Sequence, residues 1–228
     1  MTIRNLKGKI IVSSQAAVGE PFYDEKCMEA MMQSVINGGA SALRVAGARD
    51  VKLAKKFDVP VIGLTKPEKL PANWKSVVYI TPGIIEVKEL IEADADIIAF
   101  DGTMRQRPDG SNLEQIISLI HSAGKLAMAD ISTFEEGVNA ENLGADIIST
   151  TLAGYTDESG EAGEGPDFEL LEKLVKKLEN PVFLEGRIWS LDDVKRAFEI
   201  GAYAVVIGSA ITRPHLITRR FVSALLAP

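Results

Sequence analysis

The chain has 228 residues, of which 46% are hydrophobic, so it can bury one large core as a single domain spanning residues 1–228. Its formal net charge of −7 argues against a nucleic acid or an anionic membrane as partner, because both attract basic faces. A single cysteine, Cys27, excludes an intrachain disulfide framework, and no run approaches the roughly 20 apolar residues of a membrane span. The apolar run near the basic N-terminus is also too short for a signal sequence, so we expect a soluble, cytoplasmic protein.

Eight short apolar runs along the chain predict eight β-strands. Four of them follow a repeated phrase of small residues that closes a helix, and the other four start after Gly or Pro. The predicted strands cover residues 9–14, 42–46, 60–65, 96–100, 125–129, 146–150, 181–185 and 204–208. Their apolar and β-branched residues at nearly every position are typical of parallel strands that are covered on both faces.

Amphipathic segments between these runs predict the helices. Apolar residues recur with the helical period, as in Met28, Met31, Met32 and Val35, and we expect these methionines to fill the core. Strands that alternate with helices at about 28 residues per unit build a parallel sheet, and eight units close it into a (β/α)8 TIM barrel. A further extended run at 77–80 is predicted to be an insertion in the third unit rather than a barrel strand.

The C-terminal ends of the predicted strands carry polar residues, and barrels place their chemistry at these ends. The residues at the strand ends are Gln15, Arg44, Lys66, Asp101, Asp130, Thr150, Thr151, Glu185, Gly186, Arg187, Gly208 and Ser209. Lys66 must lie in or beside the barrel mouth, where an ammonium needs nearby carboxylates or a lowered pKa. Asp101, Asp130 and Glu185 are available to pair with it. The structural alternative is a lysine that only closes a charge network over the barrel end.

The last two units predict a phosphate site. Gly186 and Arg187 follow the seventh strand, and Gly208 and Ser209 follow the eighth, with Arg213 just beyond. Barrels commonly bind phosphate between these two loops and the start of a short extra helix, where glycines let backbone N–H groups approach the anion. Arg213 or Arg187 could add charge-assisted hydrogen bonds. The expected ligand is therefore a phosphorylated small molecule.

No metal and no organic cofactor are predicted. Two histidines and one cysteine cannot form a histidine-rich metal site. The carboxylates at the strand ends could hold magnesium, although pairing with Lys66 and Arg44 explains them equally well. The chain also lacks a phosphate-binding lysine loop and the glycine fingerprint of dinucleotide binding.

Two segments each allow two interpretations. Residues 154–166 are Gly-rich and acidic and follow the sixth strand, so they form either a mobile lid over the mouth or a solvated loop. The C-terminal segment 217–226 is apolar on several sides, which favours either a homodimer contact or packing against the barrel. Of these two, we expect the homodimer.

Nine motifs follow one another along almost the whole chain: VSSQAAVGEPFY, LRVAGARD, VIGLTK, YITPGIIEV, DIIAFDGTMRQRPDG, MADISTFEEG, ISTTLAGYT, FLEGRI and VVIGSAITRP. This series resembles the N-acetylmannosamine-6-phosphate 2-epimerase family. The resemblance implies a phosphate-binding barrel of the ribulose-phosphate-binding type, without metal or organic cofactor. It also implies the interconversion of N-acetylmannosamine 6-phosphate and N-acetylglucosamine 6-phosphate, a step in bacterial sialic acid breakdown.

The resemblance also assigns roles to particular residues. The family's catalytic lysine falls on Lys66 and its partner glutamate on Glu185, while Arg44 and Asp130 match the residues that anchor the substrate. Gln15 matches a glutamine at the mouth of the site. We further expect Arg187 to bind the substrate, and the phosphate-binding positions fall on Gly186, Gly208, Ser209 and Arg213.

Two places depart from the family pattern. Ser14 stands where the family has Cys, and Val45-Ala46 stand where it has Ala-Asn. The missing asparagine beside Arg44 could alter a hydrogen bond to the sugar, so it bears on substrate preference rather than on the reaction.

The implied chemistry removes the proton on carbon 2 of the open-chain sugar and returns one to the opposite face. The base needs a pKa near the working pH, and enzymes bring lysine to about 7–8. Arg44 would lower the pKa of Lys66, and Glu185 would orient its amine. Whether one base or two act stays open. The alternatives are a Schiff-base lysine aldolase acting on a phosphorylated sugar and a non-catalytic phosphosugar-binding protein.

Overall fold

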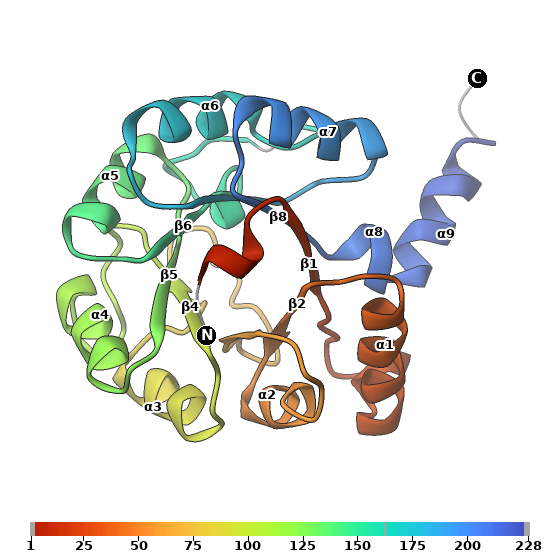
Figure 1. Ribbon diagram of the computed structural model, residues 1–228, viewed down its shortest axis with the longest axis horizontal. Helices are drawn as coiled ribbons and strands as arrows, with labels where there is room; N and C mark the ends of the chain where they lie inside the picture. Colours follow the sequence, from red (N-terminus) through yellow and green to blue (C-terminus); the bar gives the residue numbers. More distant parts are fainter. Residues whose placement is uncertain (1–2, 162, 226–228) are drawn as a thin grey trace.

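Eight parallel strands form a closed barrel in the computed structural model, which describes residues 3–161 and 163–225 (Figure 1). The strands pair in chain order, and β1 also pairs with β8, which closes the barrel. Their bounds are β1 (Lys9–Ser13), β2 (Ala42–Ala46), β3 (Val61–Leu64), β4 (Ile97–Asp101), β5 (Leu126–Asp130), β6 (Ile147–Ser149), β7 (Val182–Glu185) and β8 (Ala204–Ile207). Every predicted strand is confirmed, and residues 77–80 form no strand, as predicted.

Helices follow the strands and surround the barrel (Figure 1). The α-helices are α1 (Glu25–Asn37), α2 (Ala48–Ala54), α3 (Ile84–Glu92), α4 (Leu113–Ser122), α5 (Phe134–Asn142), α6 (Phe168–Lys177), α7 (Leu191–Ile200), α8 (Ser209–Thr212) and α9 (Pro214–Ser223). The 3₁₀ helices of the described residues are η1 (Ile3–Leu6), η2 (Pro21–Tyr23) and η3 (Thr150–Leu152). Among these helices, none has both the length and the apolar run that crossing a membrane requires.

Side chains at the first residues of the helices fix where several of them begin. Thr133 and Glu136 form a reciprocal capping box at the start of α5, and Ser190 and Asp193 form another at the start of α7. Each box satisfies backbone N–H groups that the first turn of a helix leaves without partners. The strand-to-helix connections at the barrel mouth are therefore fixed by local sequence.

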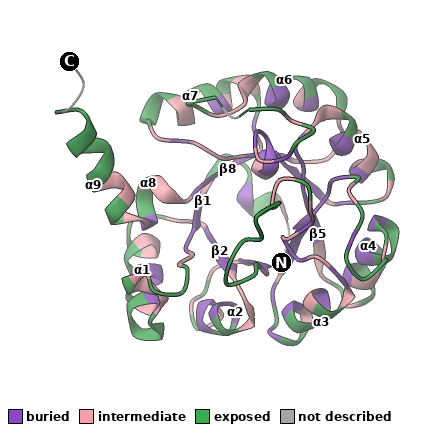
Figure 2. Cartoon of the chain, turned by 180° about the vertical axis from the view of Figure 1, so that it is seen from behind, coloured by how far each residue is buried: buried purple, intermediate pink, exposed green. Residues whose placement is uncertain are grey.

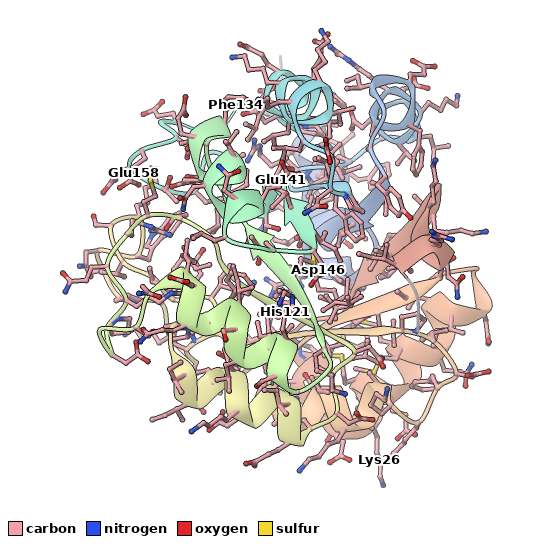
Figure 3. All side chains as sticks on the ribbon, turned by 60° about the vertical axis from the view of Figure 1, so that its left-hand side comes forward. Lys26, His121, Phe134, Glu141, Asp146 and Glu158 are labelled. Carbon is pink, nitrogen blue, oxygen red and sulfur yellow. The ribbon has the colours of Figure 1, made fainter. Side chains whose placement is uncertain are left out.

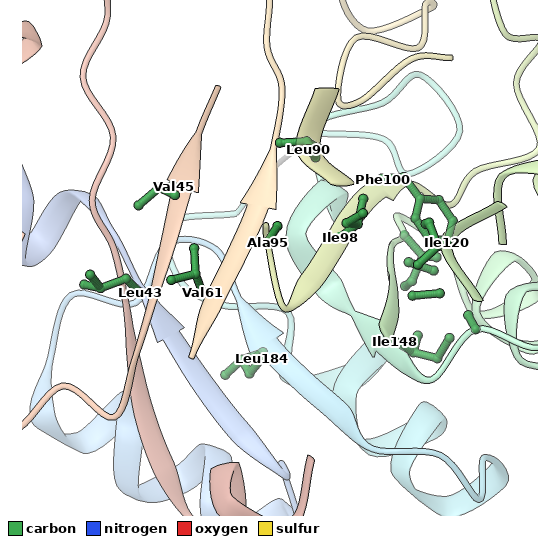
Figure 4. Packing of buried hydrophobic residues seen from close by; sticks show 14 of the residues in the cluster. Leu43, Val45, Val61, Leu90, Ala95, Ile98, Phe100, Ile120, Ile148 and Leu184 are labelled. Carbon is green, nitrogen blue, oxygen red and sulfur yellow. The ribbon is translucent and has the colours of Figure 1, made fainter. Parts of the chain in front are cut away.

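Alternation along each strand produces two cores. Side chains facing out of the barrel, such as Leu43, Val45 and Ile98, pack against the surrounding helices, as Figure 4 shows. Side chains facing inward fill the barrel, and Leu6 of η1 also joins this inner core. The inward set contains Ile11, Ala42, Ile62, Leu64, Ile97, Ala99, Met128, Ile147, Phe183, Ala204 and Val206. Figure 2 shows the result, with buried strands inside and helices whose outer faces are exposed.

The same alternation places polar groups inside the mouth. Two residues after inward-facing Ala42, Ala99, Met128 and Phe183, the strands carry Arg44, Asp101, Asp130 and Glu185. Because side chains two apart on a strand share a face, these charged groups also face inward at the C-terminal end of the barrel. The barrel therefore gathers four charges from strands that are far apart in sequence.

His121 lies outside this constellation. It projects from α4 toward Asp146 on the surface, with 2.9 Å between His121 Nε2 and Asp146 Oδ2 (Figure 3). Asp146 also accepts a hydrogen bond from the backbone N–H of Ala127. The contact ties α4 to the starts of β5 and β6, which gives His121 a structural place at the surface.

The C-terminal helix α9 stands away from the ring of helices (Figures 1 and 2). Its Phe221 is 74% exposed and Leu225, just after it, is 85% exposed. Leu226, the last residue of the predicted apolar segment, lies outside the described residues. Arg220 of α9 lies 5.1 Å from the centre of the Trp189 ring, so the helix contacts the barrel on one side and leaves an apolar side exposed.

Candidate active site

A cavity of about 780 Å³ opens at the C-terminal ends of the strands. The predicted residues that line it are Gln15, Lys66, Glu185, Gly186, Arg187, Gly208, Ser209 and Arg213. Arg44 and Asp130 are fully buried, and both contact side chains of the cavity wall. The structure thus brings all the predicted site residues together, from strands β1 to β8.

Arg44 is the centre of the buried charge cluster. Its Nη1 and Nη2 donate to Asp130 Oδ1 at 3.1 Å and Oδ2 at 2.6 Å, and its Nε lies 3.3 Å from Glu185 Oε2. Burial opposes the charged guanidinium, but Asp130 and Glu185 outweigh it and raise the pKa of Arg44. Arg44 is therefore a permanent positive charge beneath the cavity.

Glu185 contacts both this cluster and the cavity. Its burial raises the pKa of its carboxyl, Arg44 opposes that rise, and nearby Asp130 adds to it. Thr151, after β6, donates a hydrogen bond to Glu185 Oε2 at 3.1 Å. Glu185 is therefore a group that holds a proton more readily than an ordinary glutamate.

Lys66 faces the cavity from the end of β3. Its Nζ donates to Gln15 Oε1 at 3.0 Å, and Gln15 in turn donates to Ser13 Oγ at 2.8 Å. Lys66 is exposed to solvent, and it lines the cavity together with charged residues such as Glu185 and Arg213. Desolvation, followed by the positive charge of Arg44, lowers the pKa of Lys66 to about 8.

The hydrogen-bond partner of Lys66 differs from the expected one. Glu185 was expected to orient the amine, but its carboxylate contacts Arg44 and Thr151, and Gln15 holds the lysine. Glu185 still acts on Lys66 through space, because its negative charge raises the pKa of the lysine and limits the effect of Arg44.

Asp101 is not a partner of Lys66 or Arg44. It pairs with Arg105, four residues further on, at 2.6 Å between Asp101 Oδ2 and Arg105 Nη2, and it accepts hydrogen bonds from Thr103. The loop after β4 folds back over the end of that strand, so Arg105 lies next to Asp101 and pairs with it. Among the described residues, no three His, Cys, Asp or Glu side chains are arranged to bind a metal ion.

Two arginines after β4 hold the inserted segment of the third unit. Arg105 Nη1 donates to the carbonyls of Lys75 at 2.6 Å and Val77 at 3.0 Å. Arg107 donates to the carbonyls of Thr81 and Pro82. These bonds fix residues 75–82 beside the mouth of the barrel.

The cavity has an aromatic wall, defined here as Trp74 and Tyr79 at this segment together with Tyr155 of the segment 154–166. The Trp74 ring lies 6.3 Å from that of Tyr79 and 6.4 Å from that of Tyr155. Burial, together with Asp101, raises the pKa of Tyr79 to about 12, so its phenol stays protonated. Sequence reasoning gave these aromatic residues no role, because only the fold brings residues 74, 79 and 155 together.

Arg187 holds the segment 154–166. Its Nη1 donates to the carbonyl of Ala153 at 2.6 Å, just before the segment, and its Nε to the carbonyl of Gly165 at 2.8 Å, near its end. The guanidinium also lies 5.3 Å from the centre of the Tyr155 ring. The donors of Arg187 thus bind loop carbonyls at the cavity wall, and the lid interpretation of this segment stays a prediction.

The predicted phosphate end lies across the mouth from Lys66. Gly186 has φ 112°, a left-handed conformation that side chains rarely adopt, so this turn favours glycine. Arg213 lines the same end and lies 3.2 Å from Glu20, between Arg213 Nη1 and Glu20 Oε1. No motif in the sequence pointed to Glu20 as the residue that holds Arg213.

The two departures from the family pattern differ in their surroundings. Ser14 is fully buried, and within the described chain its hydroxyl has no hydrogen-bond partner. Val45 packs in the outer core, whereas Ala46 lines the cavity. The second departure, at Ala46, therefore belongs to the site.

The closed parallel barrel, with its polar cavity at the carboxyl ends of the strands, defines the chain as a (β/α)8 TIM-barrel protein. Residues 28–227 match the family model described as putative N-acetylmannosamine-6-phosphate epimerase. The chain belongs to this family, whose named members are 2-epimerases and therefore isomerases.

Relatives with similar sequences carry the same description. One from Clostridium perfringens, named putative N-acetylmannosamine-6-phosphate 2-epimerase, is 46% identical over 222 residues, covering 96% of this chain and 98% of the relative. One of the same name from Caldanaerobacter subterraneus subsp. tengcongensis is 48% identical over 224 residues, covering 97% and 92%. A solved structure of the N-acetylmannosamine-6-phosphate 2-epimerase from Clostridium perfringens superposes with a TM-score of 0.92 at 44% identity, covering 98% of this chain and 96% of that one.

Proposed function

We propose that the protein interconverts N-acetylmannosamine 6-phosphate and N-acetylglucosamine 6-phosphate by moving the proton on carbon 2 of the open-chain sugar. The observation that carries this proposal is Lys66, whose amine faces the cavity with a pKa lowered to about 8. A lysine with such a pKa is partly neutral near neutral pH and can act as a general base. The family and the names of the relatives support the same reaction.

Each charged group has a distinct part in the proposed reaction. The proton on carbon 2 is acidic only when the neighbouring carbon is an aldehyde, so the substrate reacts in its open-chain form. Lys66 removes that proton, and Gln15 holds the amine in place. Glu185, with its raised pKa, is suited to carry a proton at the cavity wall. Desolvation is the main cause of both pKa shifts, and Arg44 and Asp130 beneath the cavity modify them.

The far end of the cavity is proposed to bind the phosphate group. Gly186, Gly208 and Ser209 expose backbone at two adjacent strand ends, and Arg213 supplies a positive charge. Glu20 holds Arg213 at 3.2 Å and would share it with the phosphate. No metal or organic cofactor takes part in this proposal. Because a charged sugar phosphate is retained in the cytoplasm, we place the enzyme there. We assign its reaction to the breakdown of sialic acid and amino sugars.

Proton NMR in deuterated water tests the reaction. N-acetylmannosamine 6-phosphate incubated with the protein should give the gluco epimer with deuterium on carbon 2. Borohydride trapping separates the aldolase alternative, since a covalent adduct on Lys66 would indicate a Schiff base. Binding without turnover would instead favour the non-catalytic phosphosugar-binding protein.

The rate should follow the protonation state of Lys66. Only the neutral amine removes a proton, and its fraction grows as the pH rises through about 8. We therefore expect kcat/KM to increase about tenfold per pH unit below that value and to level off above it. Initial rates between about pH 6 and 9 measure this profile. A flat profile over that range would contradict the role of Lys66 as the base.

We also propose that the protein is a homodimer. A second apolar cavity of about 680 Å³ lies between α1, β1 and α8, lined by residues that include Ile10, Val12, Phe22 and Met31. The exposed apolar side of α9, with Phe221, is available on the same chain. If two copies associate by two-fold symmetry, α9 of each copy can bury its apolar side in this cavity of the other copy.

Phe221→Asp should convert the dimer into a monomer. A charge on the apolar side of α9 cannot be buried in the groove of a second copy without a large desolvation cost. Light scattering after size exclusion measures the mass of each form. Ile85→Asp, at an equally exposed apolar residue on α3, is the matched control and should leave the dimer intact. A wild-type protein with the mass of one chain would contradict the proposal.

A further inference from the structure

Three consecutive hydroxyl residues, Ser149, Thr150 and Thr151, lie at the end of β6, where the strand passes into η3. A 3₁₀ helix has three residues per turn, so neighbouring side chains on it point about 120° apart. Thr150 faces the backbone of β7, where its Oγ1 donates to the carbonyl of Glu185 at 3.0 Å and accepts from its N–H at 3.1 Å. Thr151 faces the mouth of the barrel.

The hydroxyl of Thr151 joins three strands. Its Oγ1 lies 2.6 Å from Asp130 Oδ1, 3.1 Å from Glu185 Oε2 and 2.9 Å from Ser149 Oγ. Thr151 also lines the cavity. A threonine hydroxyl has one proton, so the two carboxylates share a single donor. This donor lies between two negative groups that would otherwise repel each other.

The two carboxylates depend on Thr151 to different extents. Asp130 already accepts two hydrogen bonds from Arg44. The Nε of Arg44 faces Glu185 at 3.3 Å but forms no hydrogen bond with it. In the described part of the chain, the one hydrogen-bond donor to the carboxylate of Glu185 is therefore the Thr151 hydroxyl, which it shares with the nearer Asp130.

The charges that surround Glu185 pull its carboxylate in different directions. Arg44 from β2 attracts the carboxylate, Asp130 from β5 repels it, and Lys66 beyond β3 attracts it from across the cavity. None of these three charges fixes the carboxylate by a hydrogen bond. The hydrogen bond from Thr151 is directional, so it decides where the carboxyl oxygens of Glu185 lie.

We propose that Thr151 is the positioning residue for the Glu185 carboxylate in the epimerisation reaction. This inference rests on the proposed function, because that function assigns Glu185 a role in proton transfer. Thr151 acts through Glu185 and Asp130 rather than on the sugar. Its loss should therefore reduce turnover more than substrate binding.

Three variants test the proposal. Thr151→Val removes the hydroxyl and keeps the shape, so kcat should fall about 10- to 100-fold while KM stays within about threefold. Thr151→Ser restores the hydroxyl and should recover most of the rate. Thr150→Val, the matched control, removes the neighbouring hydroxyl that contacts only the backbone of Glu185. It should lower the melting temperature but keep the wild-type dependence of the rate on pH.

A second readout does not depend on turnover. The carboxyl carbon of Glu185, labelled with ¹³C and assigned with Glu185→Gln, reports its own titration. Thr151→Val should move that titration to higher pH, because the charged carboxylate loses its donor. An unchanged titration in Thr151→Val overturns the proposal, whether or not the protein turns over the sugar. A wild-type protein that leaves the sugar unchanged would overturn the proposed function instead.

Discussion

Lys66→Met should abolish epimerisation and leave the barrel folded. The variant removes the base, and general base catalysis alone contributes about 10²–10⁴-fold, so the rate should fall by at least about 10²-fold. Because the folded protein lowers the pKa of Lys66, the protonated lysine opposes folding at neutral pH. The free energy of unfolding should therefore stay the same or rise. Proton NMR of the sugar and thermal unfolding measure the two effects.

Lys66→Arg distinguishes a base from a structural charge. Arginine keeps the positive charge at the cavity, but its pKa is too high for it to release a proton near neutral pH. If Lys66 only closed a charge network, this variant would keep its activity. We expect it to be as inactive as Lys66→Met, and substantial turnover in either variant would rule out the assigned role.

Arg44→Met should be the most destabilising single change at the site. It leaves Asp130 and Glu185 buried without their positive partner, and breaking a buried pair in this way costs about 3–5 kcal/mol. Any folded fraction should also show the pH dependence of its rate moved upward, because Arg44 is one of the charges that lower the pKa of Lys66. Chemical denaturation measures the stability loss.

A surface pair provides the comparison for Arg44. Lys56→Met breaks the exposed pair with Glu29 at 3.2 Å and should cost less than about 1 kcal/mol. The double variant Arg44→Met/Asp130→Asn should regain part of the stability, since it removes one unpaired charge. Equal stability of Arg44→Met and the wild type would contradict the central place of Arg44 in the cluster.

The fold could be predicted because its signals are local and repeated. Small residues and Gly or Pro mark each strand start, and alternation then decides which residues face inward. Arg44, Asp130 and Glu185 were assigned to the mouth only because they stand at strand ends. Their gathering follows from the closure of the barrel, which the repeat of eight units already predicts.

What could not be predicted is which partner each side chain chooses. Lys66 binds Gln15 rather than Glu185, and Asp101 binds Arg105 rather than Lys66. Such choices depend on distances of a few tenths of an ångström across loops whose course has no periodic signal. The place of Thr151 between two carboxylates is of this kind, since its sequence neighbour Thr150 looks the same and points elsewhere.

Because Arg44 is buried, the group that tunes the proton affinity of Lys66 is separate from the residues that line the cavity and bear on substrate selectivity. Its guanidinium has no contact with solvent, and it lowers the pKa of the lysine from beneath the cavity. Ala46 and the aromatic wall form a different layer, which lines the cavity. Changes in the upper layer can alter which acyl sugar is accepted without disturbing the base below. Engineering thus has a cavity surface to vary above a buried electrostatic layer.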